Sequence, residues 1–169
     1  ADACWSRHCI DWEVTGEEFK KQYFDLNKTF NPIRFEPEKW ADIAKAAGTK
    51  YLLFTTKHHD GFCMWDTKYS DYKITAEDCP YHTNHYADIC AHLFESFRKR
   101  DLGVIAYFSK ADWHVDSYWS ENYERGSYQH RGPSYDPKEY PEEWERFVNF
   151  TQNQIMELGS RYGQIDGMW

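Results

Sequence analysis

The stretch KHHDGF at residues 57–62 places two adjacent histidines and an aspartate directly after an apolar run, KYLLFTT. Histidine titrates near neutral pH, so its side chain can hydrogen-bond, bind a metal ion or transfer a proton. Two neighbouring imidazoles are also poor material for an apolar core. His58 and His59 are therefore candidate functional residues. Three roles are open to them: metal ligation, hydrogen bonding to neighbouring backbone, and hydrogen bonding to a bound ligand.

The sequence around His58 and His59 gives little support to a metal site. Neither an H-x-H nor an H-E-x-x-H spacing is present, and a metal needs further ligands at suitable geometry. Consecutive residues that leave a strand also diverge. A neutral imidazole both donates and accepts hydrogen bonds, as hydroxyl groups do. Hydrogen bonding to a polyhydroxyl ligand fits the pair best, and we predict no metal and no cofactor.

A tyrosine in a later apolar run, VIAYFS at 104–109, is the next candidate. By the period of two that a strand imposes, Tyr107 and Ser109 point to one face and Phe108 to the other. Tyr107 lies near the end of the run, so its hydroxyl could reach the same ligand as the histidines. A tyrosine buried in a barrel core is the alternative, and both interpretations stay open. The loop that follows begins with Asp112, Trp113 and His114.

Composition excludes several classes of function. With 20 Lys+Arg against 28 Asp+Glu, the net charge is -8, which argues against a nucleic-acid or anionic-membrane surface. No apolar run approaches the roughly 18 residues of a transmembrane helix. The chain is rich in aromatic residues, with 8 Trp, 13 Tyr and 11 Phe, and many stand beside polar residues, as in GFCMWD and ADWHVDSYWSENY. Aromatic rings with one open face suit partly apolar ligands such as sugars.

The cysteines favour free thiols over a disulfide framework. Their number is odd and no C-x-x-C pair occurs, which argues against both a complete set of disulfides and a structural zinc site. The chain has five: Cys4, Cys9, Cys63, Cys79 and Cys90.

Hydrophobic periodicity predicts three helix–strand units after a loop-rich segment, residues 1–35, with one short helix at 15–25. Helices are expected over 37–47, 84–101 and 142–163, and strands over 50–56, 104–109 and 165–169. The first helix has an apolar face made of Trp40, Ile43, Ala44 and Ala47. The second carries Ile89, Leu93 and Phe97, flanked by Cys90 and Phe94. The third carries Trp144, Phe147, Val148, Thr151, Ile155 and Leu158.

Alternating helices and strands predict a parallel sheet, because parallel neighbours need helical crossovers. The continuous apolar run at 50–56 is typical of a strand covered on both faces. Both long polar loops follow strands, which places function at the carboxyl ends of the strands, as in (β/α)8 barrels. A doubly wound sheet would do the same, but its glycine-rich phosphate-binding turn is missing. A complete barrel needs about 250 residues, so we expect a partial barrel.

Three stretches of the sequence together resemble the α-L-fucosidases of glycoside hydrolase family 29. They are KWADIAKAAGTKYLLFTTKHHDGFCMWDTKYSDYKI, LGVIAYFSKADW and MELGSRYGQIDGMW. The resemblance covers residues 35–169 well and residues 1–34 loosely. It implies a (β/α)8 catalytic domain of which residues 1–169 form one part, cut at both ends, because the family's first-strand H-W-G motif is absent.

The resemblance also assigns roles to individual residues. His58 and His59 match the family's pair that hydrogen-bonds fucose hydroxyls, and Tyr107 matches its tyrosine at the sugar. Trp169 matches the tryptophan two residues before the catalytic nucleophile, an aspartate. That aspartate is then expected as the second residue beyond Trp169, with the acid/base carboxylate further on, so no catalytic residue is expected in this chain. Trp5 is similar to a pocket-lining tryptophan in an (E/D)-W-Y-x-R segment, although Cys4 and Ser6 replace the usual neighbours.

The activity implied is retaining hydrolysis that releases terminal α-L-fucose from fucosylated glycans. Such substrates lie outside the cytosol, which favours a secreted, periplasmic or lysosomal protein. Two alternatives stay open: a non-catalytic fragment that binds fucose or another carbohydrate, and a metal-dependent hydrolase barrel. The sequence does not indicate an oligomeric state.

Overall fold

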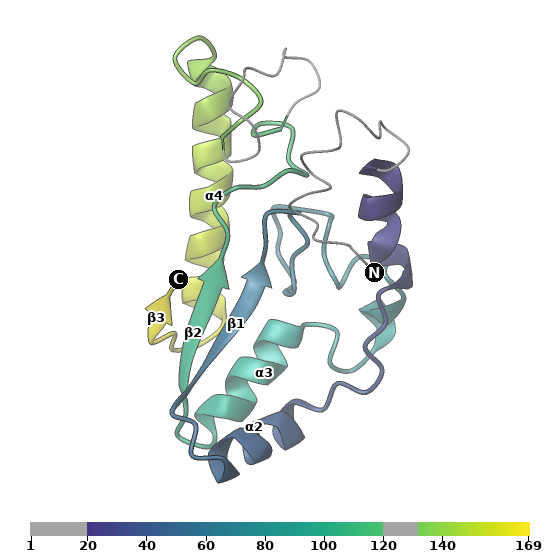
Figure 1. The fold of residues 1–169 in the computed structure, drawn as a ribbon, viewed down its shortest axis with the longest axis vertical. Helices are drawn as coiled ribbons and strands as arrows, with labels where there is room; N and C mark the ends of the chain where they lie inside the picture. Colours follow the sequence, from purple (N-terminus) through teal and green to yellow (C-terminus); the bar gives the residue numbers. More distant parts are fainter. Residues whose placement is uncertain (1–19, 120–131) are drawn as a thin grey trace.

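Residues 20–119 and 132–169 are described by the computed structural model, in which helix–strand units follow one another (Figure 1). The elements are η1 Asp25–Thr29, α2 Pro37–Ala46, β1 Tyr51–Lys57, η2 Pro80–Thr83, α3 Ile89–Arg98, β2 Gly103–Phe108, α4 Pro141–Arg161 and β3 Gly167–Met168. The helices and strands predicted from residue 37 onward are all present. Residues lying outside the described ranges include Cys4, Trp5, Ser6 and Cys9, and the predictions for them stay predictions.

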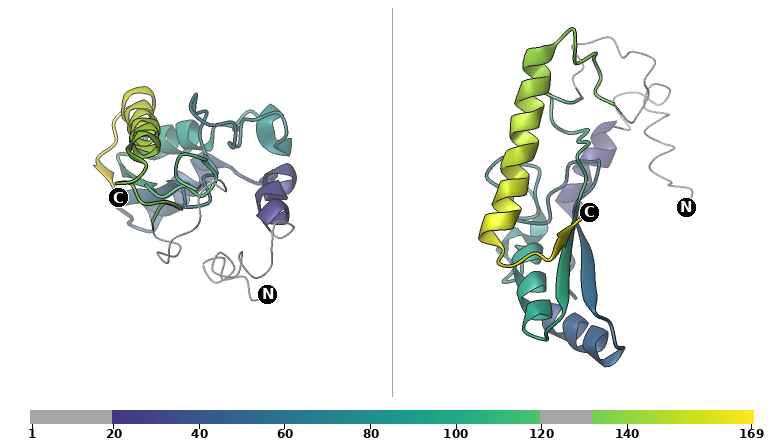
Figure 2. Two further views of the ribbon diagram at one scale, coloured as in Figure 1. Left: turned by 90° about the horizontal axis from the view of Figure 1, so that it is seen from above. Right: turned by 90° about the vertical axis from the view of Figure 1, so that its left-hand side faces the viewer.

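The strands form one parallel sheet in the order β1-β2-β3, as the alternation of elements predicted. Helix α3 connects β1 to β2, and α4 connects β2 to β3. Both helices lie on the same side of the sheet (Figure 2). The main core fills the space between, where Val104, Ala106 and Phe108 of β2 are buried in one cluster with residues of α3.

The other face of the sheet is open among the described residues, which cover β1 on one face only, so the cover predicted for both faces of β1 stays a prediction for the complete barrel. Tyr51 and Leu53 are 56% and 43% exposed. Their neighbours Leu52 and Phe54 point the other way and pack against the core. The apolar run reads as continuous because it has one face against the helices and one apolar face that no described element covers.

Helix α2 has the predicted position, but of its predicted buried face only Ala44 packs against the core of the described residues. Trp40 and Ile43 are 49% and 68% exposed, whereas Ala41 is fully buried. The Trp40 ring lies edge-on to Phe35, with ring centroids 5.2 Å apart. Pro37 stands in the first turn of this helix, as the sequence indicated. The small Ala41 side chain therefore faces the core, and the larger apolar residues lie toward solvent.

Helix α3 buries the predicted stripe. Its first turn is capped by Asp88, whose carboxylate accepts a hydrogen bond from the backbone N–H of Ala91 at 3.0 Å. The same carboxylate accepts a 2.7 Å bond from the Tyr162 hydroxyl, which ties the start of α3 to the end of α4. The buried residues of the stripe are Ile89, Cys90, Leu93, Phe94 and Phe97.

Within the described ranges, no helix has the length and apolar character needed to cross a membrane.

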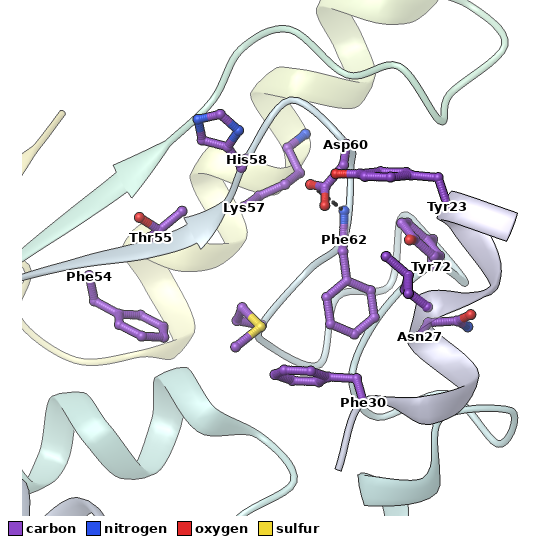
Figure 3. A pocket seen from close by; sticks show the side chains of 12 residues that line it. Tyr23, Asn27, Phe30, Phe54, Thr55, Lys57, His58, Asp60, Phe62 and Tyr72 are labelled. Carbon is purple, nitrogen blue, oxygen red and sulfur yellow. Dashed lines mark hydrogen bonds between the residues drawn. The ribbon is translucent and has the colours of Figure 1, made fainter. Parts of the chain in front are cut away.

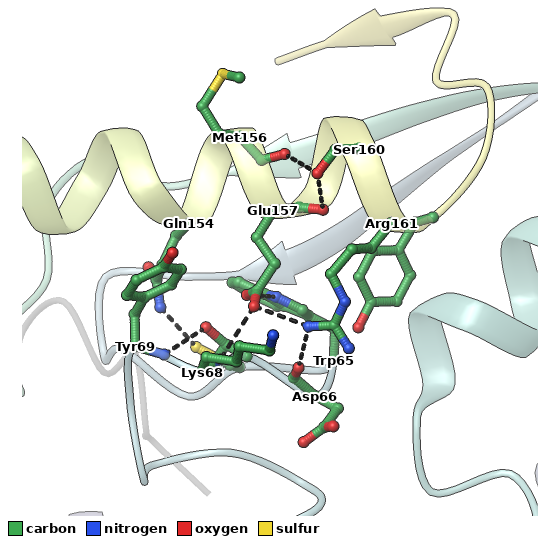
Figure 4. A network of polar contacts seen from close by, with 12 residues as sticks. Trp65, Asp66, Lys68, Tyr69, Gln154, Met156, Glu157, Ser160 and Arg161 are labelled. Atoms are coloured by element: carbon green, nitrogen blue, oxygen red, sulfur yellow. Dashed lines mark hydrogen bonds and ion pairs between the residues drawn. The ribbon is translucent and has the colours of Figure 1, made fainter.

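Helix α4 buries polar residues that periodicity did not predict. Glu157, 5% exposed, accepts hydrogen bonds from Trp65 Nε1 at 2.9 Å, from the backbone N–H of Lys68 at 3.1 Å and from Arg161 at 2.8 Å (Figure 4). The bonds from Trp65 and Lys68 fasten α4 to the loop after β1, whereas Arg161 belongs to α4 itself. Of the predicted stripe, Phe147, Thr151 and Leu158 are buried, and Trp144 is 37% exposed.

The aromatic residues beside polar ones are mostly buried, contrary to the expectation of rings with an open face. Trp65 is fully buried in the main core. Trp113, Tyr118 and Trp119 form a second buried cluster with Phe147 of α4. Of their polar neighbours, Asp66 accepts hydrogen bonds from Lys73 and Thr75, and Asp112 accepts one from Lys57.

Candidate active site

The end of β1 contains a β-bulge that decides where the following side chains point. Thr55 pairs with Tyr107, but Lys57 pairs with Phe108, so Thr56 is an extra residue. The Thr56 hydroxyl donates to the Tyr107 carbonyl at 2.8 Å. A bulge bends a strand and re-aims the residues after it. Here it sends the Lys57 side chain to the helix-covered side, where it is fully buried.

Three of the predicted site residues meet just beyond this bulge. The His58 ring is nearly parallel to that of Tyr107, with centroids 5.6 Å apart and an interplanar angle of 14°. The rings of His58 and His59 lie 4.4 Å apart. Burial lowers the pKa of both histidines, and the positive charge of Lys57 adds to the effect at His59. Both imidazoles are therefore neutral near neutral pH.

Trp169 extends the same row across the open face of the sheet. Its backbone N–H donates to the Ala106 carbonyl at 2.9 Å, and its carbonyl accepts from Phe108 N–H at 3.0 Å. In a parallel ladder this pattern sets Trp169 opposite Tyr107, so both side chains leave on one face. Thr55 is on the other side of Tyr107 in the row. The Trp169 ring is 74% exposed and borders the candidate site.

His59 has a defined tautomer. The Ser109 hydroxyl donates its single proton to the Ala111 carbonyl at 2.9 Å. The short contact between Ser109 Oγ and His59 Nδ1 must then be a bond that Nδ1–H donates. In the neutral ring, Nε2 carries the lone pair and is a hydrogen-bond acceptor. Ser109 was assigned only a facing direction from sequence, and it proves to orient the imidazole.

The two histidines sit in a turn that is tied to the loop after β2. Gly61 N–H donates to the His58 carbonyl at 3.0 Å, and Trp113 N–H donates to the His59 carbonyl at 2.7 Å. The Trp113 ring lies 5.3 Å from the His59 ring. Gly61 has φ +86°, a conformation open to glycine at little cost. Loops from two neighbouring strands thus fix one backbone turn.

Sequence reasoning missed a buried polar group behind the histidines. Lys57 Nζ donates to Asp112 Oδ2 and to Gln154 Oε1, both at 2.8 Å. Asp112 is 2% exposed and Gln154 fully buried. Asp112 had been placed only in a loop, and Gln154 lies beside the predicted stripe of α4. A lysine at the end of an apolar strand was the available signal, but without the bulge its direction could not be inferred.

A cavity of about 420 Å³ opens on the other side of His58, at the edge of β1 that faces away from β2 (Figure 3). Its wall is mainly apolar, with Phe30, Phe62 and Tyr72 among the lining residues. The Asp60 carboxylate faces it and accepts a 3.3 Å hydrogen bond from Phe62 N–H. Burial raises the pKa of Asp60 to about 6. This carboxyl group therefore changes its charge within the physiological range.

Asp60 should make the stability of the full-length protein depend on pH. Between about pH 4 and 6 the folded state keeps the proton that the unfolded state has lost, so the free energy of unfolding falls as pH rises. Asp60→Asn removes this loss. We expect the free energy of unfolding of the variant to rise by about 1–3 kcal/mol relative to that of the wild type between pH 4 and pH 7. Denaturant unfolding at several pH values measures this difference. The exposed Asp71→Asn is the control, and an Asp60→Asn difference that is constant with pH would contradict the assignment.

Metal ligation and disulfide bonding find no support in the described part of the chain. No group of at least three His, Cys, Asp or Glu residues suited to a metal ion occurs there. Cys63, Cys79 and Cys90 are buried free thiols, as predicted. Burial raises the pKa of Cys63 and of Cys90 far above the ordinary range, so these thiols are unreactive.

Comparison with known proteins gives consistent matches over nearly the whole chain. The family model described as Alpha-L-fucosidase matches residues 7–169. Alpha-L-fucosidase 1 of Arabidopsis thaliana is 29% identical over 140 residues, which cover 83% of this chain and 22% of the plant protein. The plasma alpha-L-fucosidase of Homo sapiens is 30% identical over 149 residues, or 88% of this chain and 30% of the human protein. The chain thus spans less than a third of either relative.

A solved structure is similar to this chain at about the same level of sequence identity. It is a GH29 alpha-L-fucosidase from Bacteroides thetaiotaomicron, trapped as a covalent intermediate with 2-fluoro-fucosyl fluoride. The match has a TM-score of 0.70 and 33% identity, and it covers 88% of this chain and 30% of that one. The catalytic domain of such enzymes is a (β/α)8 barrel, and the three-stranded parallel sheet with its helices corresponds to part of it.

Proposed function

The chain belongs to the alpha-L-fucosidase family, and on that premise we propose that the full-length protein is an exo-acting, retaining glycoside hydrolase that releases terminal α-L-fucose from fucosylated glycans. The observation that carries the proposal is the meeting of neutral His58 and His59 with Tyr107 at the carboxyl edge of the sheet, on its open face. In a barrel this edge carries the active site. Neutral donor–acceptor side chains there suit a sugar better than a charged ligand.

Each of the recognition residues has a proposed task. His59 Nε2 accepts a hydrogen bond from a fucose hydroxyl, because Nδ1 is committed to Ser109. His58, held against the Tyr107 ring, exchanges hydrogen bonds with a neighbouring hydroxyl. The exposed Trp169 ring offers a surface for the apolar face and methyl group of the sugar. We further propose that Trp5, outside the described residues, lines the same pocket.

The carboxylates that perform the chemistry are proposed to come from elsewhere in the full-length protein. The nucleophile is an aspartate two residues beyond Trp169, and the acid/base lies further on. One carboxylate attacks the anomeric carbon and forms a glycosyl-enzyme, while the other first protonates the leaving oxygen and then activates water. The trapped covalent intermediate of the Bacteroides relative supports this route. Residues 1–169 are then the recognition part of one barrel domain, and they hold the sugar for attack.

Hydrolysis of an aryl α-L-fucoside tests the proposal directly. We expect the full-length protein to release the aryl group, with fucose formed first as the α-anomer when the products are followed by NMR. Residues 1–169 alone should have no measurable turnover, because they lack both carboxylates. An aryl β-D-galactoside is the control substrate. Fucose binding without turnover by the full-length protein would favour a non-catalytic sugar-binding role. Turnover by the purified 1–169 chain would refute the placement of the nucleophile.

An extracytoplasmic location is also part of the proposal. Its support is the nature of fucosylated substrates and the similarity to a plasma enzyme of Homo sapiens. Fractionation of the native source, with activity assayed in each fraction, tests it.

A further inference from the structure

We propose that three buried residues act as positioning residues, which hold the His58–His59 turn in the geometry needed for binding. They are the ion pair of Lys57 and Asp112, and Gln154, which accepts a hydrogen bond from Lys57. The inference rests on the proposed function only for the activity it affects; the placement of the turn can be measured separately. None of the three residues faces the open side of the sheet where the sugar is proposed to bind. Their effect on the reaction would therefore pass through the histidines.

The environment of Lys57 is unusually restrictive for a charged side chain. Its ammonium group has no solvent exposure, and it donates to Asp112 and Gln154 while lying 4.5 Å from the ring centre of Phe108 and 5.0 Å from that of Phe150. Lys57 and the residues around it belong to β1, β2, α4 and the loop after β2. One cation thus connects every element that surrounds the turn.

Stability alone is a weak reason for such a pair. Desolvating two charges costs several kcal/mol, and apolar residues of similar volume often stabilise a protein as well or better. A buried ion pair does supply direction, because its hydrogen bonds fix both partners to short distances. Lys57 immediately precedes His58 along the chain, so fixing its side chain on the helix-covered side directs the next side chain away from it.

Asp112 fixes the other end of the turn. Its Oδ2 receives Lys57, and its Oδ1 accepts from the backbone N–H groups of His114 at 3.0 Å and Val115 at 3.1 Å. The residue between, Trp113, donates its own N–H to the His59 carbonyl at 2.7 Å. The Ser109 N–H that precedes this loop donates to the Lys57 carbonyl at 3.1 Å. The histidine turn is therefore held at one end through the Lys57 backbone and at the other by Trp113, whose following residues are bonded to Asp112.

The test compares charge-neutral replacements in the full-length protein. Lys57→Met with Asp112→Asn removes both charges yet keeps an oxygen for the two backbone donors, so we expect folding to be retained. We expect kcat/KM for the aryl fucoside to fall about 10- to 100-fold, mostly in kcat, because small misplacements of substrate-holding groups have effects of that size. The matched control is Lys73→Met with Asp66→Asn, a pair in the loop after β1 whose side chains are 19% and 49% exposed. It should leave kcat/KM unchanged.

A measurement that needs no substrate separates this inference from the proposed function. In protein labelled with ¹³C at histidine Cε1, the signals of His58 and His59 should shift or broaden in the Lys57/Asp112 double variant, while that of exposed His82 should not. This holds even if the protein proves not to cleave fucosides. Unchanged signals and unchanged kcat/KM in a folded double variant would overturn the inference.

A milder variant decides the matter if the double variant does not fold. Gln154→Met removes one acceptor from Lys57 and leaves the ion pair in place. It should perturb the same two histidine signals and lower kcat/KM several-fold with little change in melting temperature. A fall in melting temperature with the histidine signals unchanged would mean that the three residues serve only the fold, and the inference would fail.

Discussion

Replacing His59 by alanine in the full-length protein is expected to lower kcat/KM for an aryl α-L-fucoside about 5- to 150-fold. The neutral ring presents Nε2 as an acceptor because Nδ1–H is bonded to Ser109. Its removal is expected to leave a substrate hydroxyl without a partner, which costs about 1–3 kcal/mol, and about 1.4 kcal/mol corresponds to tenfold in rate. Steady-state kinetics measure the loss. Its division between kcat and KM reports whether the bond tightens in the transition state.

Two further substitutions at the same position separate binding from structure. His59→Gln carries an amide at about the reach of Nε2 and should recover part of the loss. His59→Asn places its amide near Nδ1, so it can keep the Ser109 contact and should be as poor as alanine. If the Asn variant retains activity and the Gln variant does not, the imidazole serves mainly its contact with Ser109, and the structural interpretation is correct. His82→Ala, on the exposed surface of η2, should be neutral throughout.

The meeting of the candidate residues could be predicted from the sequence because it depends on features that a linear pattern carries. The end of an apolar run places His58 and His59 at the carboxyl end of β1, and the crossover between parallel strands brings Tyr107 alongside. Period two then gives the face on which Tyr107 lies. These inferences need only the order of elements, which periodicity identified correctly from residue 37 onward.

Other features depend on contacts that no pattern records. The bulge at Thr56 reverses the direction of the Lys57 side chain. The Thr56 hydroxyl is bonded to the carbonyl of Tyr107, a residue far along the chain. The buried face of α2 was assigned to Trp40, Ile43, Ala44 and Ala47 because apolar residues at this spacing form one face of a helix. In the described structure Ala41 faces the core, and of the predicted face only Ala44 packs against it. Burial of a charge or exposure of an apolar ring is decided by the neighbouring elements, and local periodicity does not contain them.

Gly61→Ala is expected to destabilise the full-length protein by about 2–5 kcal/mol. Two costs combine, since an alanine at φ +86° is strained by roughly 1–2 kcal/mol and an extra methyl group in a packed interior adds about 1–3 kcal/mol. The methyl carbon would lie 2.5 Å from Asp112 Oδ1 and 2.8 Å from His114 Cβ. Asp112 cannot withdraw easily, because Lys57 and the loop backbone hold it. Denaturant unfolding of the variant measures the sum.

Two other glycines allow the strain and the clash to be measured apart. Gly48 has φ +76°, and no atom of the described residues lies within 4 Å of where the methyl group of an alanine would stand. Gly48→Ala should therefore lose only the stability that corresponds to backbone strain. Gly159 lies in α4 with similar open space around it, and Gly159→Ala should gain about 0.5–1 kcal/mol. The excess of Gly61→Ala over Gly48→Ala is then the cost of displacing Asp112 and His114. Equal losses at the two positions would mean that both residues move freely, and a freely moving Asp112 could not hold the histidine turn in place.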